Sequence, residues 1–221
     1  MKELVFVKRA FVCVLVVALM ALGPLGSAAA LTTADYPKFY LDREPLKIGL
    51  LYQQSPEIEG EFIVYQYRNA LASDPDERFW NIAVHNLWTG NGTNYPILAS
   101  DQTNPDVAAG RVTYESRQSG NGDIYVLELR DAGGGSPRLI GSGPATQERP
   151  RISASHVVWK NLANDNLEYW DFAAQTTSVV PESTGVEFWD VDGDMVVFSV
   201  AGSPQDTLYS WRLGEMAYPV E

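Results

Sequence analysis

The sequence has few of the residues that metal, redox and nucleic-acid sites depend on. Only one cysteine and two histidines occur among its 221 residues. A single cysteine cannot form an intrachain disulfide or a cysteine-rich zinc or iron–sulfur site. The 16 Lys and Arg are outnumbered by 28 Asp and Glu. This negative balance argues against sequence-independent binding to nucleic acid, which needs clustered basic side chains.

The first 30 residues have the composition of a secretory signal peptide. Residues 1–9 carry three basic side chains, an apolar run follows over 10–22, and alanines 28, 29 and 30 end the segment. The run is shorter than the roughly 20 residues that span a bilayer as a helix. We therefore expect cleavage after Ala30, a secreted, periplasmic or cell-surface location, and no membrane span in the mature chain. An uncleaved membrane anchor is the alternative.

Removal of this segment makes the imbalance of charge larger. The remaining 191 residues would carry 13 basic and 27 acidic side chains and no cysteine. Such a chain must be held together by its hydrophobic core, without disulfides. A domain of this size can bury roughly 70% of the surface of its unfolded chain, which is enough for a stable core.

Four stretches of the remaining chain share one pattern: an aliphatic residue, a small or polar turn, and an apolar run that ends in an aromatic residue. They cover residues 58–65, 107–114, 152–159 and 191–198. The aromatic ends are 49, 45 and 39 residues apart: Tyr65, Tyr114, Trp159 and Phe198. The position two before each stretch is occupied by Pro56, Pro105, Pro150 and Trp189.

A second pattern keeps the same period. The strand-like stretches 81–87, 123–129, 166–172 and 207–213 begin 42, 43 and 41 residues apart. Two independent patterns with one period indicate an internal repeat. Gly- and Ser-rich turns separate these stretches, and a short apolar run such as 177–180 or 95–98 completes a repeat as its fourth strand.

A repeat of 40 to 45 residues with four short strands is typical of a β-propeller blade. We predict an all-β fold, a β-propeller of four-stranded antiparallel blades with four full repeats over 56–221. Segments 39–43 and 46–52 look like strands three and four of a preceding blade, which predicts an N-terminal half-blade over 31–55. The half-blade either decorates a four-bladed ring or belongs to a fifth blade whose inner strands are missing, because the chain is truncated or because another chain supplies them. A homo-oligomer would follow if the ring is incomplete.

The stretch 105–126 resembles the TolB-like, WD40-like propeller repeat of extracytoplasmic bacterial and archaeal proteins. Its proline, aliphatic residue, turn and aromatic end are followed by a Ser- and Gly-rich turn and by Asp123-Ile124-Tyr125-Val126. The resemblance spans about 56–220. Family repeats often carry Ser-Pro-Asp-Gly in the first turn, of which only Asp192-Gly193 remains. The resemblance implies a propeller but no single activity, because such propellers serve binding, assembly and catalysis.

Three aspartates in the last repeat form a candidate calcium site. Asp190, Asp192 and Asp194 surround Gly193 and offer the oxygen ligands that Ca²⁺ prefers. Numbered as an EF-hand loop, however, the sixth position is Met195 and the twelfth is Ala201. We favour a structural turn between two strands, with a weak calcium site as the alternative and no other cofactor.

The remaining candidates are aromatic and acidic side chains. Trp80 and Trp88 flank the third strand of the first repeat without counterparts in the other repeats, which makes them candidates for binding a ligand at the surface. Glu57, Asp106 and Asp190 fall near the inner strands, where a glycosidase-type propeller would place its carboxylates. His85 and His156 occupy unrelated places in their repeats, and we interpret both as packed residues.

We predict an exported, non-enzymatic β-propeller that serves as a scaffold for a protein or glycan partner at the cell envelope or outside the cell. No residue is assigned a catalytic role. A glycosidase-type propeller hydrolase with carboxylates in its channel is the alternative.

Overall fold

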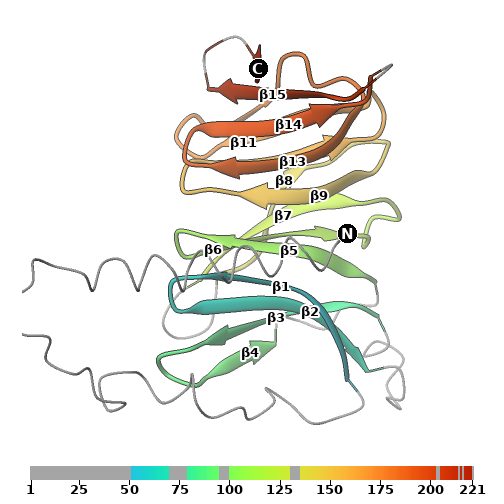
Figure 1. Ribbon diagram of the computed structural model, residues 1–221. Coiled ribbons are helices and arrows are strands. Elements are labelled where there is room, and N and C mark those ends of the chain that lie inside the picture. The colour runs from blue at the N-terminus through green and yellow to red at the C-terminus, as the bar shows by residue number, and fades with distance from the viewer. Residues whose placement is uncertain are drawn as a thin grey trace, which may run out of the picture. The chain divides into compact units, whose positions relative to one another are not determined.

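The computed structural model describes one part of the chain (Figure 1). The described residues are 51–69, 79–94, 100–129, 135–202, 205–213, 215 and 217–220. The chain divides into two compact units, Met1–Glu44 and Pro45–Glu221, and the described residues all lie in the second. The predicted signal peptide over 1–30 and residues 31–50 of the predicted half-blade lie outside them.

The described residues form strands and turns, with no helix of the length and apolarity that crossing a membrane requires. The sixteen strands make four antiparallel sheets of four, each called a blade below. Blades 1 and 2 comprise β1 (Leu51–Glu59), β2 (Phe62–Asn69), β3 (Asn81–Asn86), β4 (Gly92–Asn94), β5 (Gln102–Ala108), β6 (Arg111–Ser116), β7 (Asp123–Glu128) and β8 (Arg138–Gly141). Blades 3 and 4 comprise β9 (Gln147–Ile152), β10 (His156–Asn161), β11 (Asn166–Asp171), β12 (Thr176–Val179), β13 (Val186–Asp192), β14 (Met195–Val200), β15 (Thr207–Arg212) and β16 (Tyr218–Pro219). Each predicted repeat is therefore one sheet, whose strands pair in chain order.

The prolines and aromatic ends that define the repeat face each other across the first two strands of a blade. Asn104 and Pro105 form a bulge in β5, because Thr103 pairs with Glu115 and Asp106 pairs with Thr113, so that both bulge residues lie opposite Tyr114. Proline cannot donate a hydrogen bond to the sheet, and a bulge relieves it of that requirement. Blades 1 and 3 repeat the bulge at Pro56 and Pro150.

The first blade starts earlier than predicted. Strand β1 begins at Leu51, five residues before the predicted boundary between the half-blade and the propeller. Residues on both sides of the bulge pair with β2, Gln54 with Gln66 and Glu57 with Val64, so the strand is continuous through the bulge. Residues 51–55 therefore belong to blade 1. Blade 4 has no proline here; its bulge lies between Val186 and Phe188.

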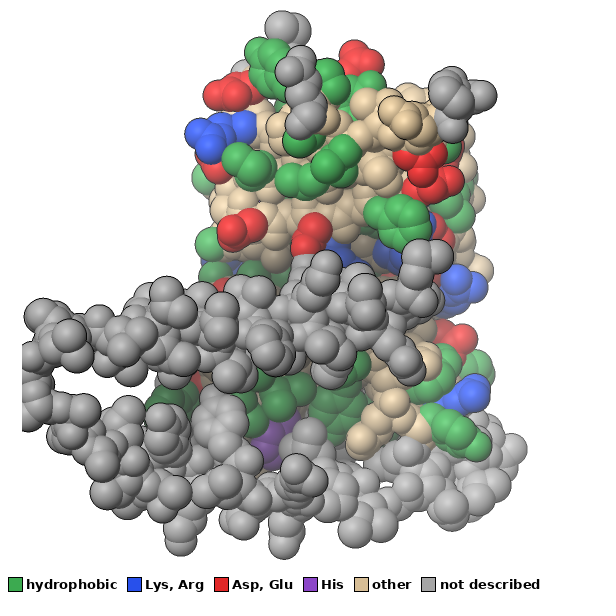
Figure 2. Space-filling view, viewed as in Figure 1, with side chains coloured by type: hydrophobic (Ala, Val, Ile, Leu, Met, Phe, Trp, Pro, Cys, Tyr) green, Lys and Arg blue, Asp and Glu red, His purple; other side chains and the backbone are tan. Residues whose placement is uncertain are grey.

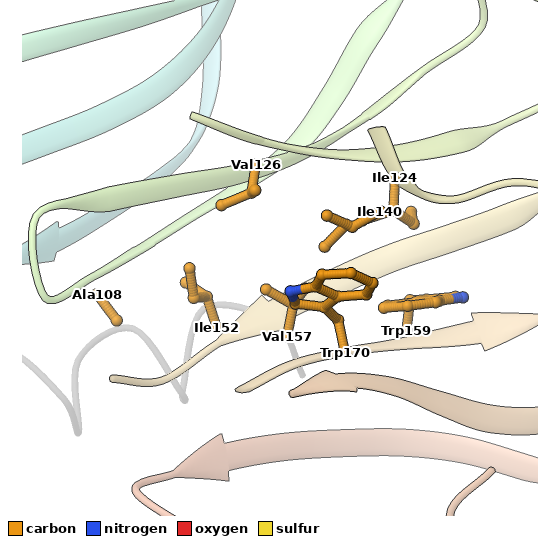
Figure 3. Packing of buried hydrophobic residues seen from close by; sticks show 8 residues of the cluster. All are labelled: Ala108, Ile124, Val126, Ile140, Ile152, Val157, Trp159 and Trp170. Carbon is orange, nitrogen blue, oxygen red and sulfur yellow. The ribbon is translucent and has the colours of Figure 1, made fainter. Parts of the chain in front are cut away.

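Stacking of consecutive blades forms the core. Figure 3 shows the cluster between blades 2 and 3, where Trp159 and Trp170 of blade 3 pack against Ile124 and Ile140 of blade 2. A second cluster joins blades 1 and 2 through Val64 and its neighbours, and a third joins blades 3 and 4. Figure 1 shows the blades following one another in chain order, with blades 1 and 4 at opposite ends.

Candidate functional site

The first strand of each blade carries one charged side chain at the same register. Strands β1, β5, β9 and β13 contact one another in turn, which makes strand one the innermost of each blade. The charged residue lies one place after the proline, or after Trp189 in blade 4, and pairs with the middle of strand two. The four are Glu57, Asp106, Arg151 and Asp190, called the inner row below.

Asp106 is the most perturbed member of the inner row. Its Oδ1 accepts a hydrogen bond from the backbone N–H of Val107 at 2.9 Å, and its Oδ2 accepts one from Ile152 at 3.0 Å. Burial raises the pKa of Asp106 to about 6; Arg151 opposes the shift, and the neighbouring charge of Glu57 adds to it. Asp106 therefore exchanges a proton under mildly acidic conditions, beside one acidic and one basic side chain.

A second buried carboxyl group lies on the neighbouring strand. Glu115 of β6 is almost completely buried, and its oxygens bind Arg117 Nε and Asn104 Nδ2, each at 3.1 Å. Burial raises the pKa of Glu115, and the interactions with Arg117 and Asn104 lower it in part. Because Asn104 lies in the bulge of β5 and Arg117 directly follows β6, both partners belong to blade 2, and we interpret Glu115 as a structural group that fixes the bulge.

The two candidate tryptophans occupy different environments. Trp88 is 70% exposed in the turn between β3 and β4. This turn is fixed by Asn86, whose Oδ1 accepts hydrogen bonds from the backbone N–H groups of Trp88 and Thr89 at 2.9 and 3.0 Å. Trp80 is half-buried, and the guanidinium carbon of Arg68 lies 4.7 Å from the centre of its ring. Trp88 is thus presented to solvent, whereas Trp80 packs within blade 1.

Two of the three aspartates of the calcium hypothesis, Asp190 and Asp192, lie on β13, and Asp194 lies in the turn that follows. Asp190 Oδ1 accepts a hydrogen bond from Val191 N at 3.0 Å, and Asp194 Oδ2 lies 3.7 Å from Arg212 Nε. In the described part of the chain, no three or more His, Cys, Asp or Glu side chains are grouped so as to hold a metal ion. Calcium binding by Asp190, Asp192 and Asp194 stays a prediction from the sequence.

The two histidines lie in different blades and at different positions of the repeat. His156 is buried, with Nδ1 3.4 Å from the carbonyl oxygen of Gly193 in blade 4 and Nε2 3.8 Å from Asp171 Oδ2. His85 lies on β3 of blade 1, where it pairs with Ile63. The structure does not join them in one site.

Arg151 is the member of the inner row that the sequence analysis missed. The glycosidase hypothesis predicts acidic side chains on the inner strands, and Arg151 is basic. The available signal was positional: Arg151 follows Pro150 as Glu57 follows Pro56 and Asp106 follows Pro105.

No protein-family profile matches the chain, and no curated protein matches it in sequence. Solved structures do match. TolB from Acinetobacter baumannii is 16% identical with a TM-score of 0.56, over 73% of this chain and 42% of TolB. The β-propeller domain of the Trilobed protease from Pyrococcus furiosus, described as having an open velcro topology, is 14% identical with a TM-score of 0.56, over 78% of this chain and 58% of that one. The chain has a β-propeller fold.

A puromycin-hydrolysing peptidase from Mycobacterium tuberculosis also matches the propeller, with 13% identity and a TM-score of 0.56 over 77% of this chain and 29% of that one. The chain spans less than two thirds of the length of each of these three structures. At these identities the likeness extends to the fold alone, so the function must be argued from this propeller's own side chains.

Proposed function

We propose that this propeller is an exported, non-enzymatic scaffold that binds a protein or a glycan at the cell envelope or outside the cell. The residues at the N-terminus support export, since they combine basic side chains, a short apolar run and small residues. The single observation that carries the binding role is the exposure of Trp88 on a turn of defined geometry.

An exposed tryptophan suits both classes of partner. Its flat apolar ring stacks on the apolar face of a sugar and fills pockets in protein interfaces, where tryptophan is enriched. The two hydrogen bonds to Asn86 Oδ1 hold the backbone of the turn before any partner arrives. A preformed turn loses less conformational entropy on binding than a flexible loop does.

A glycan array and envelope extracts test this role with the full chain. We expect Trp88→Ala to bind the ligand or partner that wild type retains with an affinity at least about tenfold lower, because an anchoring aromatic residue contributes much of the binding energy. Leu162→Ala is the control, because Leu162 is also exposed in a turn and belongs to blade 3. Equal binding by wild type and Trp88→Ala, or no binding by wild type at several salt concentrations, would contradict the proposal.

The inner row favours a second candidate function, the glycosidase-type hydrolase. Such an enzyme needs one protonated and one ionised carboxyl group near each other. Asp106 has a pKa of about 6, and the charge of Glu57 contributes to raising it. This is consistent with Asp106 as the protonated acid and Glu57 as its ionised neighbour. Hydrolysis of a panel of aryl glycosides between pH 4 and 7 tests this function. The hydrolase hypothesis predicts activity in wild type that Asp106→Asn abolishes. A lack of activity on every substrate rejects the hypothesis for that panel.

A further inference from the structure

The sequence contains the tripeptide Gly-Asn-Gly twice, and the fold places the two copies in opposite environments. The first copy is Gly90-Asn91-Gly92, between β3 and β4. The second is Gly120-Asn121-Gly122, between β6 and β7. An asparagine that precedes glycine can lose its side-chain amide without an enzyme, because no Cβ atom shields the glycine nitrogen. The repeated tripeptide allows the effect of the fold to be separated from that of the local sequence.

The reaction starts at the backbone nitrogen of the glycine. After this nitrogen gives its proton to base, it attacks Cγ of the asparagine; the N–Cγ bond forms, the Cγ–Nδ2 bond breaks, and ammonia leaves with a proton from water. Water then adds to one of the two carbonyl carbons of the cyclic imide and breaks its bond to the nitrogen, which gives aspartate or isoaspartate. Water is the co-reactant, and nothing is oxidised or reduced. The side-chain amide must therefore be free to rotate, and the glycine nitrogen must be accessible.

Asn121 meets neither condition. Its Nδ2 donates hydrogen bonds to the carbonyl oxygens of Gly143 and Ala145 at 2.7 and 2.9 Å, so both amide hydrogens are engaged. Gly122 is buried, and its N–H faces Thr146 Oγ1 at 3.5 Å. The cyclic imide can form here only after these contacts break.

Asn91 meets both conditions. It is exposed, and its side-chain amide forms no hydrogen bond among the described residues. Its backbone carbonyl oxygen accepts a hydrogen bond from Asn86 N at 2.8 Å. Hydrogen-bonded and non-bonded pairs alternate along an antiparallel ladder, so the next pair, His85 and Gly92, exchanges no backbone bonds. The N–H of Gly92 therefore points away from β3, on the outer strand of blade 1 (Figure 1), and Gly92 is exposed.

We propose that Asn91 is a site of spontaneous deamidation, in which the backbone nitrogen of Gly92 attacks Cγ of Asn91 and water completes the conversion to aspartate and isoaspartate. Asn121 is the protected copy of the same tripeptide. Strand β4, which follows Asn91, has three residues and lies at the edge of its sheet. The backbone around Asn91 can therefore adjust to ring closure at a small cost in stability.

The modified turn is the one that presents Trp88, so the effect on binding rests on the proposed function. In isoaspartate the chain runs through the former side chain, and the former backbone carbonyl becomes a carboxylate. The hydrogen bond from Asn86 N to that carbonyl oxygen, and the one from Asn91 N to Thr89 Oγ1 at 3.3 Å, then no longer close the turn. The converted chain should lose affinity for a ligand that stacks on Trp88.

The product also carries a negative charge where Asn91 is neutral. Figure 2 shows acidic side chains spread over the visible surface of the described blades. A further carboxylate in an exposed turn should therefore leave the fold intact, since charges at exposed positions contribute little to stability. Ion exchange can separate converted from unconverted chain by this charge, so that both fractions enter the same binding assay.

Incubation of the folded full chain at mildly alkaline pH, followed by tryptic digestion and mass spectrometry, tests the deamidation. Trypsin separates the two copies, because Arg111 and Arg117 lie between them. We expect Asn91 to convert at least about tenfold faster than Asn121, because the two hydrogen bonds of the Asn121 amide must break first. In urea both copies should convert at similar rates. Equal rates in the folded chain, or a difference that persists in urea, overturns the proposal.

Gly92→Ala tests the attacking atom. A Cβ atom on Gly92 would lie 3.5 Å from His85 Nδ1, an ordinary van der Waals contact, so the variant should fold. The added Cβ shields the backbone nitrogen, and conversion of Asn91 should slow severalfold. Conversion at an unchanged rate overturns the attack by the Gly92 nitrogen.

The binding assay of the separated fractions tests the effect on the turn. The converted fraction should bind less of the ligand that the unconverted fraction retains, and Gly92→Ala incubated in the same way should keep its binding. Equal binding by the two fractions overturns the effect on the turn. An absence of binding by both fractions contradicts the proposed function instead, and leaves the conversion of Asn91, which mass spectrometry measures, as a separate result.

Discussion

Asp106 Oδ2 accepts a hydrogen bond from the backbone N–H of Ile152 at 3.0 Å, so that a carboxylate on the innermost strand of blade 2 holds the innermost strand of blade 3. Ile152 contributes its side chain to the cluster that the two blades share. Through this hydrogen bond, Ile152 connects Asp106 of the polar inner row to the apolar core between the two blades. The bond also explains why a partly buried carboxyl group is kept at this position, since an ionised or neutral oxygen can accept it.

The stability of the propeller should depend on pH through Asp106. The folded chain retains the proton of Asp106 up to a pKa of about 6, whereas an unfolded aspartate releases it near pH 4. Between these values the folded state binds more protons, so the contribution of Asp106 to the free energy of unfolding falls as the pH rises. The loss should be about 1–3 kcal/mol between pH 4 and 7.

Urea denaturation at pH 4, 5, 6 and 7 measures this dependence. Other carboxyl groups titrate in the same range, and Asp106→Asn separates their contribution because its side chain does not titrate. We expect the difference in stability between wild type and the variant to change by about 1–3 kcal/mol across the range. A constant difference would show that Asp106 has an ordinary pKa.

Gly141→Ala should destabilise the interface between blades 2 and 3. A Cβ atom at Gly141 would lie 2.8 Å and 2.9 Å from two atoms of the Trp159 ring and 3.2 Å from Ile124 Cβ. Trp159 is fully buried, so its ring cannot move aside into solvent. Overpacking of this kind costs about 1–3 kcal/mol, which denaturant titration resolves. Unchanged stability would mean that the ring is less tightly held than the structure shows.

Ser153 should contribute more to stability than its neighbour Ser155, although both hydroxyl groups bind the carbonyl oxygen of Gly193, at 2.7 and 2.6 Å. Ser153 is buried, and its Oγ also accepts a hydrogen bond from His156 N at 3.1 Å. Ser153→Ala therefore removes the acceptor of the buried His156 N–H, at a cost of about 1–3 kcal/mol, whereas the Gly193 carbonyl oxygen keeps its bond from Ser155. Ser155→Ala should cost about half of that or less, because water reaches its site. Equal losses would argue against the burial of Ser153.

Export should leave a chain that begins at Leu31. Expression of the full chain in a secreting bacterial host, followed by mass spectrometry of the intact product, measures the N-terminus directly. The exported product should lack residues 1–30 and therefore Cys13. Recovery of the uncleaved chain in the membrane fraction would favour the membrane anchor instead.

The repeat could be predicted from the sequence because each of its signals has a local cause. Pro105 marks the bulge of strand one, and Tyr114 marks the residue opposite that bulge. The start of β1 could not be located, because the apolar stretch before Gln53 looks like a strand of its own. The polar pair Gln53 and Gln54 in fact continues the strand, paired with Tyr67 and Gln66.

The candidate site was predictable only in part. From the sequence, Trp80 and Trp88 were equal candidates for binding a ligand at the surface, since both flank the same strand. The difference depends on Arg68, which lies on β2 and covers the ring of Trp80. The burial of Asp106 likewise depends on blade 3, whose Ile152 lies 46 residues further along the chain. Contacts between blades are not encoded in the local pattern that defines a blade.

The most direct test of the stacked propeller compares Leu167→Ala with Leu208→Ala by chemical denaturation. The two leucines occupy one position of the repeat, but Leu167 is covered by blade 4 and Leu208 is 44% exposed. Leu167→Ala should lose about 2–5 kcal/mol and Leu208→Ala less than about 1 kcal/mol. Equal losses would contradict the stacking of blades in chain order, in which blade 4 covers Leu167.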